Sequence, residues 1–227
     1  LFRSIIGHRW MVIFLARKNI FISKTTAHKY MNKELNLHAI TVKRKPKYVK
    51  SEKNKVFSNI LNQNFNVTER NKVWSTDFTY IRMANGKMRY NCTILDLSKR
   101  EAIATVNSKW INTDLAIKAL SKAIEREKPN EGLILHSDQG VQFTSWAFVD
   151  YCKENGIIQS MSKTGCPYDN APMERFYNTF KNCFYYRFAF ESAQRLDEMT
   201  AQYINWYNYV RPHSYNNYLT PMEARFI

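Results

Sequence analysis

The amino-acid sequence predicts an α/β fold: a mixed five-stranded sheet flanked by helices, with a basic, partly helical N-terminal extension. Three strand-like segments in a row, followed by alternating helical and strand-like segments, favour a mixed sheet with helices on its faces. Hydrophobic residues make up 44% of the 227 residues, which excludes a disordered chain. The first 60 residues carry 14 Lys and Arg against 2 Asp and Glu, so a basic arm precedes a nearly neutral body.

The basic arm contains two helical patterns and a linker. The apolar run at residues 10–16 is interpreted as part of a buried helix, because Arg17-Lys18 stands where a signal peptide would have small residues. Residues 25–37 place apolar side chains at helical spacing. Residues 41–55 are rich in Lys and Arg without an apolar period, which indicates an extended linker suited to a polyanion.

The strands of the body are predicted from segments rich in β-branched and aromatic residues. Asn85-Gly86 is a strong signal for a tight turn, so the first two strands should form a hairpin. The expected strands cover residues 74–83, 88–97, 101–107, 132–138 and 157–158.

The helices of the body are predicted from apolar residues at helical spacing. Asp169-Asn170, followed by Pro172, is a good helix start. Further along that helix, Phe176, Phe180 and Phe184 recur every four residues and are expected in the core. The expected helices cover residues 115–124, 146–152, 172 to about 188, and 193–208.

Three acidic residues stand in unusual places. Asp77 lies inside a strand, where Asp is disfavoured. Asp138 ends an apolar strand, and ligand groups in α/β sheets gather at such carboxyl ends. Glu174 lies in the first turn of a helix. Each residue alone has an ordinary explanation. Asp77 could be a solvated residue of an edge strand, Asp138 a turn residue, and Glu174 a partner of the helix dipole.

Together with their neighbours, these acids resemble a known family. The sequence WSTDFTYI around Asp77, HSDQGVQF around Asp138 and DNAPME ending at Glu174 resemble the three acid motifs of insertion-sequence transposases with a retroviral-integrase-type catalytic core. The gap of 35 residues between Asp138 and Glu174 is typical of that family, and Lys181 matches its basic residue two helical turns further on. The chain looks closest to the second-frame product of two-frame insertion sequences.

The resemblance implies a ribonuclease-H-like fold and a transposase. Asp77, Asp138 and Glu174 would be both the catalytic residues and the ligands of two Mg²⁺ ions, with Mn²⁺ as a substitute. The implied reaction is cleavage at the element ends, followed by attack of the new 3′-OH on target DNA, without a nucleotide cofactor. The implied partners are double-stranded DNA, as element ends and as target, and further copies of the chain in a dimer or larger assembly.

Contacts with DNA are expected from two places. Asn178 and Lys181 follow Glu174 by four and seven residues, so all three share one helix face. In the linker, the side chains expected to touch phosphates are Lys43, Arg44, Lys45 and Lys47. The alternative for Lys181 is a lysine that contacts only solvent, and the alternative for the linker is a solvated tail that does not bind DNA. Accordingly, residues 1–66 are predicted to be a DNA-binding segment and linker, and residues 67–227 the catalytic core with a helical tail.

Other classes of protein fit the sequence less well. No apolar stretch approaches the roughly 18 residues of a membrane span, so no membrane partner is expected. No cysteine precedes Cys92 and no C-x-x-C occurs, so zinc is not expected. We expect a location in the bacterial cytoplasm, at the nucleoid. Two alternative functions remain: a nuclease of the same fold that cuts without joining, and a catalytically inactive DNA-binding regulator.

Overall fold

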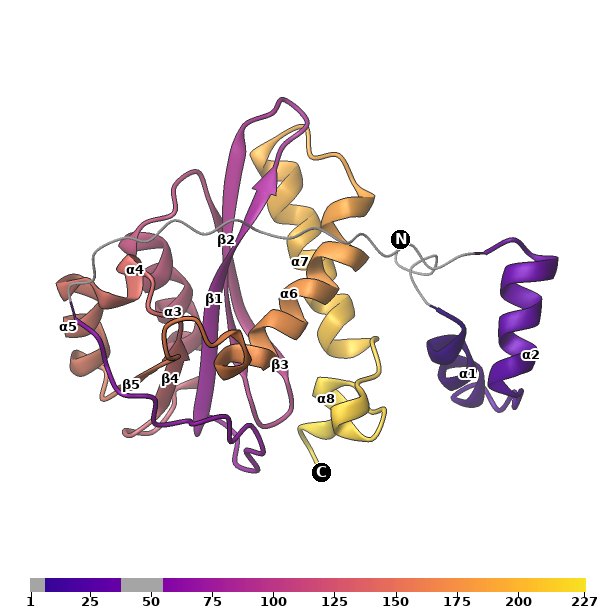
Figure 1. Ribbon diagram of the computed structural model, residues 1–227, viewed down its shortest axis with the longest axis horizontal. Helices are drawn as coiled ribbons and strands as arrows, with labels where there is room; N and C mark the ends of the chain where they lie inside the picture. Colours follow the sequence, from indigo (N-terminus) through magenta and orange to yellow (C-terminus); the bar gives the residue numbers. More distant parts are fainter. Residues whose placement is uncertain (1–6, 38–54) are drawn as a thin grey trace.

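A computed structural model describes residues 7–37 and 55–227 (Figure 1). The four predicted DNA contacts of the linker, Lys43, Arg44, Lys45 and Lys47, lie outside the described residues. Five strands form one sheet in the order β3-β2-β1-β4-β5. Their bounds are β1 Val73–Arg82, β2 Met88–Asp96, β3 Glu101–Ser108, β4 Ile134–Ser137 and β5 Ile158–Met161.

The sheet is mixed, as predicted. The first three strands are antiparallel neighbours, whereas β4 pairs in parallel with both β1 and β5. The hairpin between β1 and β2 turns at Asn85-Gly86, where Gly86 has φ of +80°, a conformation that glycine adopts without steric cost. This order makes β1 the central strand, with β4 beside it.

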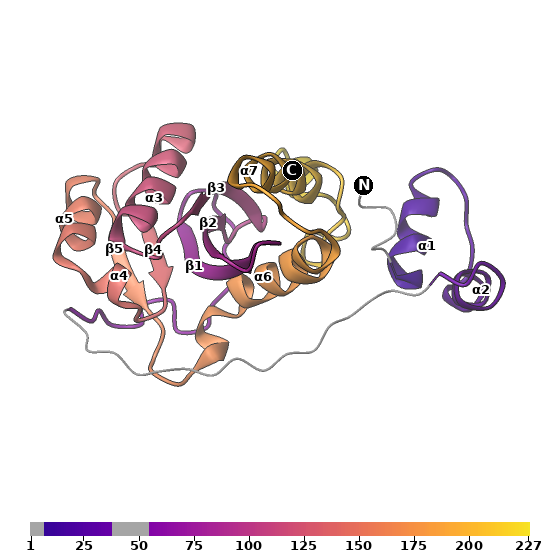
Figure 2. The same ribbon diagram turned by 90° about the horizontal axis from the view of Figure 1, so that it is seen from above.

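Helices cover both faces of the sheet (Figure 2). Helices α3 (Thr113–Glu127), α4 (Val141–Thr144) and α5 (Trp146–Glu154) lie on one face, and α6 (Ala171–Cys183) and α7 (Ala193–Tyr209) lie on the other. Because successive side chains of a strand point to opposite faces, Val73 belongs to the core under α6 and α7, and Trp74 to the core under α3 and α5.

The catalytic-helix candidate α6 is shorter than the sequence predicts. It ends at Cys183 instead of near residue 188, and a short 3₁₀ turn, η4 (Tyr185–Arg187), follows it. The change comes at Phe184, which leaves the helical conformation with φ of −131° and ψ of −69° while its ring stays buried against Phe180 and Tyr203. Phe176, Phe180 and Phe184 are all buried, as predicted.

The C-terminal tail contains the short helices η5 (Ser214–Asn216) and α8 (Pro221–Ala224). It is tied back to the body by ion pairs: Arg225 of the tail, Arg126 of α3 and Arg70 ahead of β1 surround the buried carboxyl groups of Glu101 and Glu127. Buried carboxylates need such partners, so the tail is part of the folded core and not an appendage.

The N-terminal region forms helix α1 (His8–Ala16), helix α2 (Lys24–Lys29) and the π-helical turn η2 (Tyr30–Glu34). The prediction that residues 10–16 belong to a buried helix is half wrong: the helix exists, but none of its residues is buried. Its contacts with the body are few, chiefly Trp10 against Arg211 and Tyr218 and an ion pair of Arg17 with Glu223, so its apolar side chains stay partly exposed. Across residues 7–37 and 55–227, the structure contains no helix with the length and apolarity needed to span a bilayer.

Candidate catalytic site

Asp77 lies in the middle of the central strand β1, on the face covered by α6 and α7, and is half-buried. One of its oxygens, Oδ1, accepts a hydrogen bond of 2.7 Å from the backbone N–H of Phe78. Burial, followed by the negative charge of Asp138, raises the pKa of Asp77 to about 8, and Glu174 adds to the rise. The carboxyl group of Asp77 therefore lies within electrostatic range of both Asp138 and Glu174.

Asp138 is exposed and follows directly after β4, the parallel neighbour of β1. Its Oδ1 accepts a hydrogen bond of 2.9 Å from the N–H of Gly140. A Cβ atom on Gly140 would come within 2.9 Å of that same oxygen. The glycine therefore lets the backbone approach the carboxyl group and hold it at the end of the strand.

His136 supports Asp138 from inside the sheet. The ring is fully buried, with Nδ1 at 2.9 Å from Ser160 Oγ and Nε2 at 3.2 Å from Ser162 Oγ, so it bonds β4 to β5 and the residue that follows β5. Burial lowers the pKa of His136 to about 4, so the ring is neutral at pH 7. We assign it a structural role next to Asp138.

Glu174 reaches the site from the first turn of α6. Two bonded groups place that helix. The hydroxyl of Tyr177 donates a hydrogen bond of 2.8 Å to the carbonyl oxygen of Asp77, and Asn170, at the helix start, accepts one of 2.5 Å from Ser75 Oγ. Asn170 does not cap the helix with its side chain, which instead bonds β1. Partial burial raises the pKa of the Glu174 carboxyl group.

Lys181 and Asn178 lie further along α6. Lys181 is half-buried; burial lowers its pKa, and the negative charge of Asp77 acts in the opposite direction. Asn178 is exposed, and its amide oxygen accepts a hydrogen bond of 2.8 Å from Asn182. The structure thus brings Lys181 close to Asp77, while Asn178 is exposed.

The three carboxyl groups have the chemistry of a divalent-cation site. As the side chains lie, no three His, Cys, Asp or Glu residues within the described ranges 7–37 and 55–227 already stand at metal-binding distances. The negative charges of Asp138 and Glu174 nevertheless add to the burial that raises the pKa of Asp77, and a cation would relieve that repulsion. Carboxylate oxygens are the ligands that Mg²⁺ prefers, so the donors fit this ion.

Sequence reasoning missed the residues that hold the site together. Tyr177 was not singled out, and Asp169 and Asn170 were predicted only to start a helix. In the structure Asp169 is buried and bonded on three sides, and Asn170 joins α6 to β1. The only available signal was their position inside the third acid motif.

Comparisons with known proteins agree with this geometry. Two families, both described as integrase core domain, match residues 67–167 and 155–221. The putative transposase InsK of IS150 from Escherichia coli is 32% identical over 219 residues, covering 96% of this chain and 77% of the relative. The IS904 transposase of Lactococcus lactis is 36% identical over 166 residues, covering 73% and 65%. An uncharacterized 31 kDa protein of IS600 from Shigella sonnei is 31% identical and covers 98% and 82%.

Among solved structures, a simian T-cell lymphotropic virus intasome chain aligns with a TM-score of 0.62 and 15% identity, over 95% of this chain and 70% of that chain. The HTLV-2 integrase catalytic core domain, in complex with magnesium, aligns with a TM-score of 0.53 and 17% identity, over 68% of this chain and 96% of that chain. At such identities the likeness concerns the fold, and it confirms the ribonuclease-H-like fold of retroviral integrase cores.

Proposed function

The chain belongs to the DDE transposases of insertion sequences, and from that premise we propose that it cleaves DNA at the ends of its element and joins the freed 3′-OH to target DNA. The observation that carries the proposal is that Asp138 and Glu174 both lie within electrostatic range of the Asp77 carboxyl group, in an integrase-like core. Asp77 lies on β1, Asp138 directly follows β4, the parallel neighbour of β1, and Glu174 comes from α6 across them.

We propose that Asp77, Asp138 and Glu174 hold two Mg²⁺ ions, which Mn²⁺ can replace. When bound, such a pair would supply Lewis-acid stabilisation to the attacking and leaving oxygens of a phosphodiester. The magnesium named with the HTLV-2 integrase core supports the choice of ion. The chain itself would fix the three carboxylates. Strand β1 carries Asp77, the N–H of Gly140 holds Asp138, and helix α6, which is bonded to β1 through Tyr177, carries Glu174.

The two steps of the reaction share one chemistry. Water first attacks a phosphodiester at the element end, one P–O bond forms as another breaks, and a 3′-OH is released. That 3′-OH then attacks a phosphodiester of the target, again exchanging one P–O bond for another. No covalent intermediate with the protein and no nucleotide cofactor is needed, because each step conserves the number of P–O bonds.

The proposed DNA contacts surround the carboxylates. Lys181, close to Asp77, is in position to approach a phosphate oxygen, and Asn178 presents a polar side chain on the exposed side of α6. The linker residues Lys43, Arg44, Lys45 and Lys47 would bind phosphates without reading sequence. We keep the proposed division into a DNA-binding segment at 1–66 and a catalytic core at 67–227.

We further propose that the chain works as a dimer or larger assembly, because two element ends must be brought to one target. The name intasome and the dimeric form given for two of the structural relatives support this. Acting on bacterial DNA, the protein would work in the cytoplasm at the nucleoid.

A nicking assay tests the site. Wild-type protein, incubated with supercoiled plasmid and Mn²⁺, should nick it, and EDTA should abolish nicking. Glu174→Gln, which keeps the shape but removes the charge, should reduce nicking by at least about 100-fold. Glu154→Gln, an exposed glutamate at the end of α5, is the matched control and should retain full activity. Equal nicking by wild type and Glu174→Gln would refute the site.

A joining assay tests the second step. DNA with a pre-cut 3′-OH element end should become covalently linked to the plasmid in the presence of Mg²⁺. Nicks without joined products, across a set of candidate ends, would instead support a nuclease. Binding to DNA without nicking or joining in either metal would support an inactive regulator.

A further inference from the structure

An irregular segment ahead of β1 contacts the supports of two proposed catalytic residues. We call residues 56–63 the strap. It runs beside β5: the N–H of Met161 donates to the carbonyl oxygen of Ser58 at 3.3 Å, and the N–H groups of Ile60 and Leu61 donate to Ser160 Oγ at 2.9 and 3.3 Å. Ser160 is the hydroxyl that also bonds His136, the buried ring two residues before Asp138. The strap therefore reaches the support of Asp138 through a single side chain.

The strap reaches the support of Glu174 through Asp169. This carboxyl group lies in the 3₁₀ turn η3 (Pro167–Asn170) that leads into α6, and only 2% of the residue is exposed. It accepts hydrogen bonds from Gln63 Nε2 at 2.7 Å, from Asn59 Nδ2 at 2.9 Å and from the N–H of Lys163 at 2.9 Å. These donors lower the pKa of Asp169, so it is a bound carboxylate at neutral pH.

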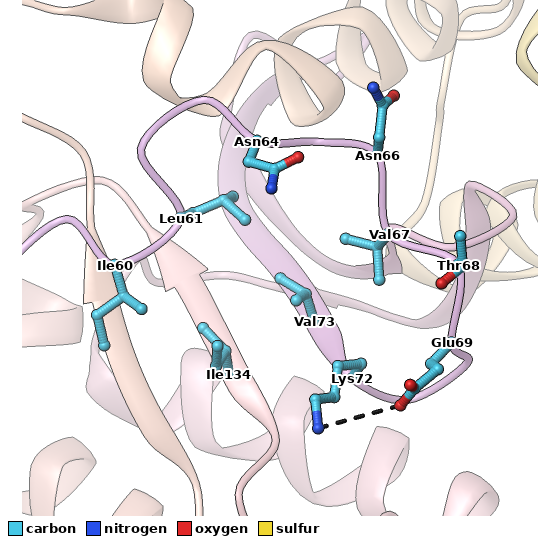
Figure 3. Close-up of a pocket in the computed structure, with 10 residues that line it drawn as sticks. All are labelled: Ile60, Leu61, Asn64, Asn66, Val67, Thr68, Glu69, Lys72, Val73 and Ile134. Atoms are coloured by element: carbon cyan, nitrogen blue, oxygen red, sulfur yellow. Dashed lines mark ion pairs between the residues drawn. The ribbon is translucent and has the colours of Figure 1, made fainter.

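Apolar packing holds only part of the strap, because Leu61 belongs to the core under α6 and α7 and Phe57 packs against the core under α3 and α5. Leu61 is buried, but about half of Val56 and of Ile60 is exposed. A cavity of about 280 Å³ lies where the strap and its continuation cross the strands, between Ile60, Leu61 and Asn64 on one side and Val73 and Ile134 on the other (Figure 3). The polar bonds to Asp169 and Ser160 add to this packing and attach the strap to the two supports.

We propose that the strap is a positioning element of the candidate catalytic site: its bonds to Asp169 and Ser160 fix the turn ahead of α6 and the end of β4, and so place Glu174 and Asp138. The inference rests on the proposed function. In the sequence the strap directly follows the linker at residues 41–55. The segment proposed to bind DNA is therefore joined, without a spacer, to the strap and so to Ser160 and Asp169, which support the two proposed catalytic carboxylates.

Exchanging the amide and the carboxylate of one hydrogen bond, in two steps, tests the proposal. Gln63→Glu places a second carboxylate against Oδ1 of Asp169 and replaces a bond with repulsion. Adding Asp169→Asn restores the bond with donor and acceptor exchanged. The amide nitrogen introduced at position 169 would face the carboxylate introduced at position 63, and the amide oxygen would still accept from Asn59 and from the N–H of Lys163. The matched control is Asn64→Asp, which adds the same charge one residue along, at an exposed side chain.

Two readouts are measured on the full chain. Hydrogen exchange of residues 163–176 should be faster in Gln63→Glu than in wild type, and should return to the wild-type rate in the double variant. In the nicking assay, Gln63→Glu should lower kcat by about 10- to 100-fold and raise the Mn²⁺ concentration for half-maximal rate, with the KM for DNA unchanged, because small displacements of catalytic groups are costly. The double variant should recover most of the rate, and Asn64→Asp should match wild type.

Several results would overturn the proposal. One is a Gln63→Glu variant whose hydrogen exchange and nicking rates equal those of wild type. Another is an Asn64→Asp variant with the same loss of nicking as Gln63→Glu, which would indicate a general charge effect. If Gln63→Glu lowers the melting temperature too far for assay, Asn59→Ser carries the same expectations: it removes the bond to Asp169 and the bond accepted from the N–H of Asn62, without adding a charge. Failure of the proposed function looks different: wild type and Glu174→Gln would nick equally, while hydrogen exchange at residues 163–176 would still report on the strap.

Discussion

The two faces of the sheet are packed in different ways. Helix α3 presents small side chains to the strands, with Ala116, Ala119 and Ala123 buried, while the rings on that face come from other elements, such as Phe143 of α4 and Phe148 of α5. Helices α6 and α7 present rings of their own, in pairs such as Phe180 with Tyr203, whose centroids are 5.1 Å apart and nearly perpendicular. Alanines let a helix approach closely but specify little about its rotation, whereas edge-to-face rings favour particular orientations.

The difference in packing matches the position of the proposed catalytic residues. In the proposed site, the carboxyl group of Glu174 on α6 has to reach Asp77 and Asp138, so the rotation of α6 and its position along the sheet both matter. The ring pairs Phe176–Tyr207, Phe180–Tyr203 and Phe184–Tyr203, together with the hydroxyl of Tyr177, fix both. Helix α3 carries none of the proposed catalytic residues, and close packing is all that its face requires.

The largest effect should come from removing a central ring of the α6 face. Phe180→Ala deletes a fully buried ring that contacts Phe176, Phe184 and Tyr203, and we expect a loss of about 3–5 kcal/mol in the free energy of unfolding. Denaturant unfolding of the variant and of wild type measures it. A loss below about 1 kcal/mol would show that the ring cluster does not hold α6.

A smaller effect is expected from overfilling the opposite face. Ala119→Leu inserts a larger side chain where Ala119 is fully buried, and should cost about 1–3 kcal/mol. Nicking per folded molecule should stay within about two-fold of wild type, because α3 places none of the three carboxylates. If nicking fell as steeply as in a variant of the α6 face, the proposed division of labour between the two faces would be wrong.

The smallest change in stability is expected from Tyr177→Phe. This variant keeps the ring but removes the hydroxyl that bonds the carbonyl oxygen of Asp77 and the side chain of Asn91, at a cost of about 0.5–1.5 kcal/mol. Nicking per folded molecule should nevertheless fall further than in Ala119→Leu, because α6 loses its bond to β1 at Asp77. Steady-state nicking under conditions where both variants are fully folded makes the comparison.

Local sequence signals predicted the parts of the fold that local forces determine. Asn85-Gly86 marked the hairpin, and the four-residue spacing of Phe176, Phe180 and Phe184 marked the core side of α6. Asp77 lies in a strand and Glu174 in the first turn of a helix, as expected, whereas Asp138 lies one residue past the end of its strand. The end of α6 was misplaced because Phe184 leaves the helix to bury its ring against Tyr203, a residue of another helix.

The supports of the site could not be predicted in the same way. Asp169 is an ordinary helix-start residue in the sequence, and its bonds to Asn59 and Gln63 join residues more than 100 positions apart. The exposure of α1 is a similar case, since an apolar run indicates a helix but not how much of the protein will cover it. Such contacts depend on the assembled fold and leave no periodic signal.

The strap also sets an order for assembly on the ribosome. Its partners Ser160 and Asp169 lie 99 to 110 residues further along the chain, so the strap is synthesised early and must wait for them. Closing a loop of that length requires the sheet to form first, because β4 and β5 bring the partners into place. A chain interrupted before α6 would therefore have its basic arm without the proposed catalytic site, and the proposed capacity to cut DNA would arise only when synthesis is nearly complete.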